Sequence, residues 1–239
     1  MMRIQWFAEM LSERGIQLSE RQNEQFHIYF KLLVEWNEKM NLTGITEEEA
    51  VYEKHFYDSL SLTFFKDFNQ VKSIADIGSG AGFPSLPIKI AFPHLKVTIV
   101  DSLNKRILFL KHVVEQLGLT EVSCIHGRAE DVARQADHRD KYDLVTARAV
   151  ARLASLNELC LPFTKKGGYF ASMKGASPQD EVDESVKSLK ELRGQVEAVF
   201  NMALPFEQSE RHIVMIKKLE PTPKKYPRKA GTPIKEPIV

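Results

Sequence analysis

The sequence predicts an α/β protein with a mainly parallel sheet, and two patterns support this prediction. From residue 72 onward, short apolar segments alternate with helical segments, which is typical of strands joined by right-handed crossovers. The last two apolar segments have no helix between them, which indicates that an antiparallel strand completes the sheet. The pattern gives seven strand candidates, at residues 72–77, 96–101, 122–127, 142–147, 168–174, 195–206 and 210–219.

The first 66 residues predict helices without strands. SERQ at 19–22 and TEEE at 46–49 both match the capping box, in which a hydroxyl precedes Gln or Glu by three positions. Apolar residues then recur every three or four positions from Phe26 to Met40, as on one face of a helix. We therefore expect an N-terminal helical extension at 1–66 packed on a main domain at 67–219, followed by a tail at 220–239.

Composition limits the class of protein. The chain has 239 residues, enough to bury a large core without a metal or a disulfide framework. Its two cysteines, Cys124 and Cys160, lie in apolar segments, so we expect packing residues and no metal site. The first residues lack the apolar core of a signal peptide, and no segment reaches membrane-spanning length. We expect a cytoplasmic monomer that does not contact a membrane.

The C-terminal tail concentrates positive charge. From Lys217 to the end there are seven Lys or Arg and two Glu, although the net charge of the whole chain is only +1. Prolines separate the basic residues, and Tyr226 lies among them. Two interpretations remain open from composition alone, a disordered solubilising end and an arm that binds a polyanion.

Three glycines at alternate positions, Gly78, Gly80 and Gly82, follow the first strand candidate. Such a loop leaves main chain open to a ligand at the carboxyl edge of a parallel sheet. A P-loop needs Lys and then Ser or Thr after its last glycine, and Phe83 stands there instead. A dinucleotide fingerprint needs glycine at 83, so that option is weakened without being excluded. S-adenosylmethionine, an adenosine ligand without phosphate, is the third option.

Acidic residues near three strand ends favour an adenosine ligand. Asp76 precedes the first glycine by two positions, and it either faces a cationic ligand or bonds its own loop. Asp101 ends the second strand, where a carboxylate can accept both ribose hydroxyls. Glu130 follows the third strand, where it either reads the edge of the adenine or simply opens a helix.

Four segments follow one another in the order DIGSGAGFP, VDSLNKRILFL, GRAED and VTARAVARL. Taken together in this order, they resemble the RsmG (GidB) family of bacterial methyltransferases. The resemblance extends upstream to EWNEKMNLTGIT and KHFYDSL, and downstream to ERHIVMIKK and PKKYPRKAGTP. It implies a Rossmann-like class I methyltransferase fold with a mainly parallel seven-stranded sheet. It also implies methyl transfer from S-adenosylmethionine to N7 of one guanine in 16S ribosomal RNA, with S-adenosylhomocysteine as product.

The resemblance also assigns residues. It implies that Gly78 and Phe83 belong to the cofactor loop, and that Ala129 and Glu130 contact the adenine. Arg148 is expected beside the methionine end of the cofactor. The resemblance gives no role to His55 or Asp58, which either pack in a capping cluster or shape the RNA pocket. The partner it implies is the small ribosomal subunit or an assembly intermediate of it.

Guanine N7 carries a lone pair and no proton, so this transfer needs positioning and no general base. No residue is therefore expected to be catalytic in the strict sense, and Arg148 and Lys174 are the candidates for orienting the guanine. The alternative for Arg148 is a salt bridge to a nearby acid such as Asp76 or Glu130, and the alternative for Lys174 is a solvated side chain. A regulatory protein that senses a dinucleotide and a small-molecule methyltransferase remain alternatives to the whole assignment. In the family context we expect the tail to be an RNA-binding arm, with Tyr226 stacked on a base.

Overall fold

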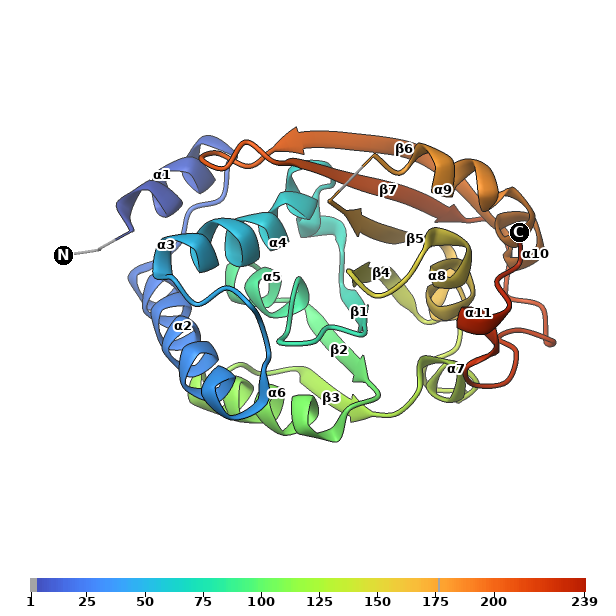
Figure 1. The fold of residues 1–239 in the computed structure, drawn as a ribbon, viewed down its shortest axis with the longest axis horizontal. Helices are drawn as coiled ribbons and strands as arrows, with labels where there is room; N and C mark the ends of the chain where they lie inside the picture. Colours follow the sequence, from blue (N-terminus) through green and yellow to red (C-terminus); the bar gives the residue numbers. More distant parts are fainter. Residues whose placement is uncertain (1–3, 176) are drawn as a thin grey trace.

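Seven strands form one sheet in the computed structural model, which describes residues 4–175 and 177–239 (Figure 1). The strand order is β3-β2-β1-β4-β5-β7-β6. Strands β1 to β5 pair in parallel, and β7 is antiparallel to both β5 and β6. The strands span Ser73–Ile77 (β1), Lys96–Asp101 (β2), Val122–His126 (β3), Tyr142–Arg148 (β4), Thr164–Lys174 (β5), Gly194–Ala203 (β6) and Glu210–Lys218 (β7). The predicted mainly parallel sheet with an antiparallel last strand is confirmed.

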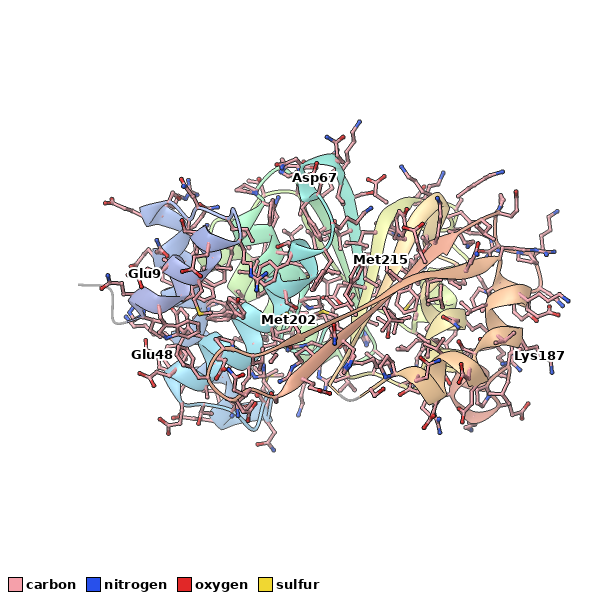
Figure 2. All side chains as sticks on the ribbon, turned by 90° about the horizontal axis from the view of Figure 1, so that it is seen from above. Glu9, Glu48, Asp67, Lys187, Met202 and Met215 are labelled. Carbon is pink, nitrogen blue, oxygen red and sulfur yellow. The ribbon has the colours of Figure 1, made fainter. Side chains whose placement is uncertain are left out.

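Helices cover both faces of the sheet, and a separate apolar core lies on each face (Figure 1). The first face carries α1 (Gln5–Glu13), α2 (Glu20–Met40), α3 (Glu48–Val51), α4 (Asp58–Ser61), α5 (Ser85–Ala91) and α6 (Asn104–Gln116). The second carries α7 (Ala129–Val132), α8 (Leu153–Cys160), α9 (Gln179–Glu184), α10 (Val186–Leu192) and α11 (Thr232–Lys235). Figure 2 shows this layering from above, with Glu9 and Glu48 on one side of the sheet and Lys187 on the other.

The N-terminal helices have no core of their own. Phe7, Phe26 and Leu33 are buried in the same cluster as Leu86 of α5 and Leu110 of α6. Helix α2 packs against both α5 and α6, and the apolar stripe of α2 supplies residues to the core that they share. Residues 52–57 form a π-helix between α3 and α4, a form that is rare and is frequently found at functional sites. The predicted boundary at residue 66 stays a prediction.

One of the two predicted capping boxes forms. The Ser19 side chain accepts from the Gln22 amide, and the Gln22 side chain accepts from the Ser19 amide, as predicted. The box predicted for TEEE is wrong, because α3 begins at Glu48 after Glu47, which makes no side-chain cap bond. In this chain the sequence pattern alone did not distinguish the two cases.

The C-terminal tail lies on the second face, beside α8 and above α7 (Figure 1). Tyr226 is 6% exposed and its hydroxyl donates to Glu191, so the prediction that it stacks on an RNA base is wrong. Burying an aromatic ring against a core is worth more than leaving it free, so the tail is fastened at this point. Within the described residues, no helix has the length and apolar character to cross a membrane.

Candidate active site

The glycine loop leaves β1 at the carboxyl edge of the sheet, where the Gly78 amide donates to the Val100 carbonyl at 2.8 Å. All three glycines have positive φ, which disfavours any other residue. A Cβ on Gly78 would lie 2.8 Å from a Val150 methyl, whereas a Cβ on Gly80 would meet nothing within 4 Å. The loop is therefore packed at Gly78 and open at Gly80.

The N-terminal helices hold this loop from behind. The Tyr29 hydroxyl, on α2, donates to the Ala81 carbonyl at 2.5 Å, and a Cβ on Gly82 would collide with it. Phe83 is only 4% exposed, and its ring stacks on those of Tyr29 and His55. Because the Phe83 ring is enclosed, only the main chain at this position is left for a ligand.

Asp76 and Asp101 lie on either side of the loop. Asp101 accepts from the Gly80 amide at 3.2 Å and from the Leu103 amide at 2.9 Å, which fixes its carboxylate at the end of β2. Asp76 is fully buried and accepts from the Ser85 amide at 3.2 Å through Oδ2. Burial raises the pKa of Asp76 to about 7, against the opposing effect of hydrogen bonds from Ser85.

Ala129 and Glu130 begin α7 just after β3, on the same edge as Asp101. The Gly127 amide donates to the Asp101 carbonyl, so the two strand ends are joined directly. Glu130 is 3% exposed, and its Oε1 accepts from the amide of Gly231 at 2.7 Å. The structure thus brings the predicted adenosine residues together, and it adds a contact with the tail that the sequence did not indicate.

Arg148 ends β4 beside the same loop, with its guanidinium 5.0 Å from the centre of the Phe83 ring. Its ion-pair partner is Asp58 of α4 at 2.8 Å, so the predicted alternatives Asp76 and Glu130 are wrong partners. Asp58 also faces Arg211 of β7 at 3.2 Å. One carboxylate between two guanidiniums leaves this cluster with a net positive charge, which favours an electron-rich ligand group next to Arg148.

His55 lies in the π-helix between the loop and Arg148. Its ring stacks on Phe83 with centroids 4.6 Å apart, and its Nε2 is 2.8 Å from the Thr43 hydroxyl. Burial and the neighbouring Arg148 charge lower the pKa of His55 to about 3, so the ring is neutral. Sequence reasoning gave His55, Asp58 and Arg211 no specific role, because their contacts with the site join segments far apart in the chain.

Lys174 does not join this group. Arg148 pairs in register with Met173, so Lys174 points to the opposite face of the sheet. Its ammonium donates to the Ala151 carbonyl at 2.9 Å and to Glu181 at 2.7 Å. The structure therefore separates the two residues predicted to orient the substrate.

The residues at this edge fit an adenosine ligand with a cationic end. The Ser79 hydroxyl and Asp76 Oδ1 are buried, and among the described residues neither has a hydrogen-bond partner. A Cβ on Gly80 would meet no protein atom within 4 Å, and the Asp101 carboxylate accepts from the amide of the same residue. Among the described residues there is no cluster of His, Cys, Asp and Glu that could hold a metal ion.

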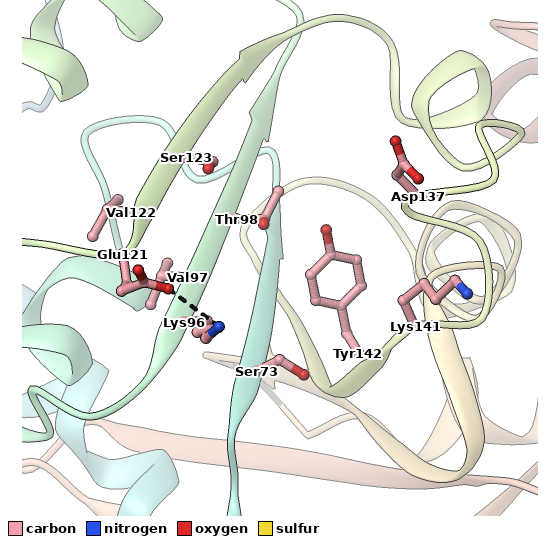
Figure 3. Close-up of a pocket in the computed structure, with 10 residues that line it drawn as sticks. All are labelled: Ser73, Lys96, Val97, Thr98, Glu121, Val122, Ser123, Asp137, Lys141 and Tyr142. Atoms are coloured by element: carbon pink, nitrogen blue, oxygen red, sulfur yellow. Dashed lines mark ion pairs between the residues drawn. The ribbon is translucent and has the colours of Figure 1, made fainter.

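A cavity of about 400 Å³ lies at the amino ends of β1 to β4, away from the glycine loop (Figure 3). Its lining includes Ser73, Thr98, Ser123 and Tyr142, together with the ion pair of Lys96 and Glu121. None of the predicted site residues lines it. Ligands of open parallel sheets bind at the carboxyl edge, so this cavity is not the predicted site.

Solved structures define the class of the fold. The chain superposes on the mitomycin 7-O-methyltransferase MmcR with a TM-score of 0.56 at 16% identity, over 79% of this chain and 60% of that one. A SAM-dependent O-methyltransferase from Thermotoga maritima gives a TM-score of 0.51 at 19% identity, over 80% and 73%. These likenesses concern the fold alone, which is that of the class I methyltransferases.

Sequence comparisons define the family. Residues 22–214 match the family model GidB, described as rRNA small subunit methyltransferase G. The chain is 58% identical to a Brevibacillus brevis protein and 59% identical to one from Listeria innocua, both named ribosomal RNA small subunit methyltransferase G. The alignments cover 98% and 97% of this chain, and 98% of each relative. The chain belongs to the GidB family of S-adenosylmethionine-dependent methyltransferases.

Proposed function

We propose that this protein methylates N7 of one guanine in the 16S RNA of the small ribosomal subunit, with S-adenosylmethionine as methyl donor. The observation that carries the proposal is the grouping at one sheet edge of an open glycine loop, three carboxylates and Arg148. Family membership supports the RNA substrate.

Residues at three strand ends are proposed to contact different parts of the cofactor. We assign the main chain at Gly78, Gly80 and Gly82 to close contact, and Asp101 to the ribose hydroxyls. Ala129 and Glu130 are assigned to the adenine. Asp76 is assigned to the ammonium of the methionine end, because a cation beside a buried carboxyl favours its ionised form.

The bound cofactor supplies a methyl group on a sulfonium, which guanine N7 can attack with its lone pair. The protein has to hold the guanine in line and exclude water, because no proton is removed from N7. Arg148 is the residue proposed to orient the base, since a guanidinium can donate to guanine O6. Asp58 and Phe83 fix the guanidinium from two sides. Lys174 lies on the other face and is left out of this role.

The RNA has to present the guanine from a loop or by extrusion. We propose that exposed basic residues near this edge and on the tail, among them Lys105, Arg128 and Lys224, contact phosphates. We propose that the substrate is the small subunit or its assembly intermediate, and that the protein acts on it as a monomer in the cytoplasm.

Mapping of N7-methylguanine tests the proposal. Small-subunit RNA from cells with and without this gene is cleaved by chemistry specific to N7-methylguanine, and the fragments are compared. One cleavage site should vanish in the deletion strain and return on complementation. Purified protein with labelled S-adenosylmethionine should restore the same site on subunits from the deletion strain. An unchanged cleavage pattern in the deletion strain would contradict the proposal.

A further inference from the structure

The C-terminal tail is fastened to the body at several points of the second face. Lys218, which is fully buried, bonds to Asp140 at 3.1 Å and to Thr222 at 2.6 Å. The Arg139 guanidinium donates to the carbonyls of residues 222, 223 and 226. These contacts fix the path of the tail up to Tyr226, which enters the second core.

Arg228 then fixes the next turn of the chain. Its guanidinium forms a fork with the Glu158 carboxylate of α8, with Nη2 at 2.8 Å and Nε at 3.0 Å from Oε2. Its amide donates to the same carboxylate at 2.6 Å, and Nη2 also donates to the Glu236 carbonyl at 2.7 Å. The Glu158 side chain is 1% exposed and the Arg228 side chain 30% exposed, so this is a partly desolvated, charge-assisted contact.

The segment held in this way, residues 228–236, places one amide against the candidate adenine site. Gly231 has φ +87°, a conformation that favours glycine, and its amide donates to Glu130 Oε1 at 2.7 Å. Within the described residues, this is the hydrogen bond that the Glu130 carboxylate makes. Oxygen Oε2 is left for another donor.

We propose that residues 228–236 form a strap that positions Glu130 for recognition of the adenine amino group. Glu130 is the second residue of a helix of only four residues, which offers little support to a side chain. The Gly231 amide on Oε1 holds the carboxylate in one orientation, so that less rotational freedom is lost when the cofactor binds. This inference rests on the proposed function. It makes the strap part of the cofactor site, whereas the sequence suggested a solubilising end or an RNA-binding arm.

The test measures base discrimination in the full-length protein. Dissociation constants are determined by calorimetry for S-adenosylhomocysteine and for S-inosylhomocysteine, in which a carbonyl replaces the adenine amino group. The unmodified protein should prefer the adenosyl compound, because a carbonyl facing the Glu130 carboxylate is repelled. Arg228→Met should weaken adenosyl binding about tenfold, which corresponds to one good hydrogen bond, and should leave inosyl binding nearly unchanged.

Two further variants keep the test decisive. Gly231→Pro removes the donating amide, and because proline fixes φ at about −65° where Gly231 has +87°, it also displaces the turn that presents this amide. It disrupts the strap without altering the Arg228 side chain, so it should reduce the same preference even if Arg228→Met does not fold. Lys187→Met is the matched control, because it removes an exposed charge of the second face outside the strap and should preserve the preference.

The outcomes separate the strap from the proposed function. If both strap variants keep the full adenosyl preference, or lose affinity for both compounds equally, the strap is overturned and the methyltransferase assignment stands. If the unmodified protein shows no adenosyl preference, Glu130 does not recognise the base, and the proposed role of the strap is overturned as well. If the unmodified protein binds S-adenosylhomocysteine with this preference but leaves ribosomal RNA unmodified, the proposed function fails on its own.

Discussion

Gly80 is the residue at which the demands of the fold and of the ligand can be separated. Its left-handed backbone costs an alanine about 1–2 kcal/mol, but the protein leaves room for the added carbon. We expect Gly80→Ala to fold and to lose at least tenfold in cofactor affinity, because its Cβ enters the space assigned to the ligand. Calorimetry with S-adenosylhomocysteine measures this loss.

Gly15→Ala is the control for that experiment. Gly15 has φ +80° and equally open surroundings, but it lies after α1, away from the loop. The two variants should show similar losses of thermal stability, and only Gly80→Ala should lose affinity. Equal cofactor binding by both variants would remove Gly80 from the site.

Asp76 gives the site a pH dependence near neutrality. Its pKa of about 7 means that the carboxyl is largely protonated at pH 5.5, and a cationic ligand end then loses its counter-charge. Cofactor affinity should therefore fall on the order of tenfold between pH 7.5 and pH 5.5, since one pKa unit corresponds to a factor of ten. Asp76→Asn should flatten this dependence, and a wild-type affinity that is constant over this range would contradict the assignment.

At the scale of elements, helix α2 supports the glycine loop. Tyr29 is fully buried, and its hydroxyl donates to the Ala81 carbonyl in the middle of the loop. Tyr29→Phe leaves that carbonyl without its donor, so we expect a loss of roughly 1–3 kcal/mol in the free energy of unfolding. Cofactor affinity should fall as well, because the loop loses its rear support.

Tyr169→Phe is the control for Tyr29→Phe, because it makes the same substitution at a more exposed site. The Tyr169 hydroxyl donates to Glu197 on an exposed surface, so its removal should change stability by less than about 0.5 kcal/mol. Chemical denaturation of both variants compares them directly. If Tyr29→Phe were as mild as Tyr169→Phe, the N-terminal helices would not be needed to hold the loop.

At the scale of the whole molecule, the lowered pKa of His55 makes the free energy of unfolding depend on pH. Its pKa is about 3 in the folded protein, whereas a histidine in the unfolded chain has its ordinary value near 6.5. The unfolded state therefore binds the proton first as pH falls, and stability is lost between pH 6.5 and pH 3. At pH 4.5 the loss from this one group is roughly 3 kcal/mol, at about 1.4 kcal/mol for each pH unit.

Comparison with His55→Asn isolates this contribution. The variant keeps all other titrating groups, including Asp76, whose raised pKa acts in the opposite direction over the same range. Denaturation at pH 7 and pH 4.5 should show a smaller loss of stability on acidification in His55→Asn than in the wild type. Parallel losses in the two proteins would mean that His55 is not held neutral.

The strands could be predicted because their signal is local. Period-two and apolar patterns depend on neighbouring residues, and each of the seven strands overlaps its predicted segment. Asp76, Asp101 and Glu130 could be predicted as one group because the carboxyl ends of parallel strands share an edge.

Contacts across the fold could not be read from the sequence. Arg148 and Asp58 are 90 positions apart, and Glu130 and Gly231 are 101 apart, so no spacing rule connects them. Tyr226 looked like a free aromatic in a basic tail, yet the second core encloses its ring. In each case a partner on another element decides what the side chain does.

The sequence by itself determined the alternating architecture, the open glycine loop and the acids at the strand ends, because each depends on local pattern and on a general property of parallel sheets. Only the tertiary structure decided which charges meet at that edge. It joined Arg148 to Asp58, neutralised His55 by burial and brought the tail amide to Glu130. Burial and charge pairing act through space, and the chain order does not record which distant segments come together.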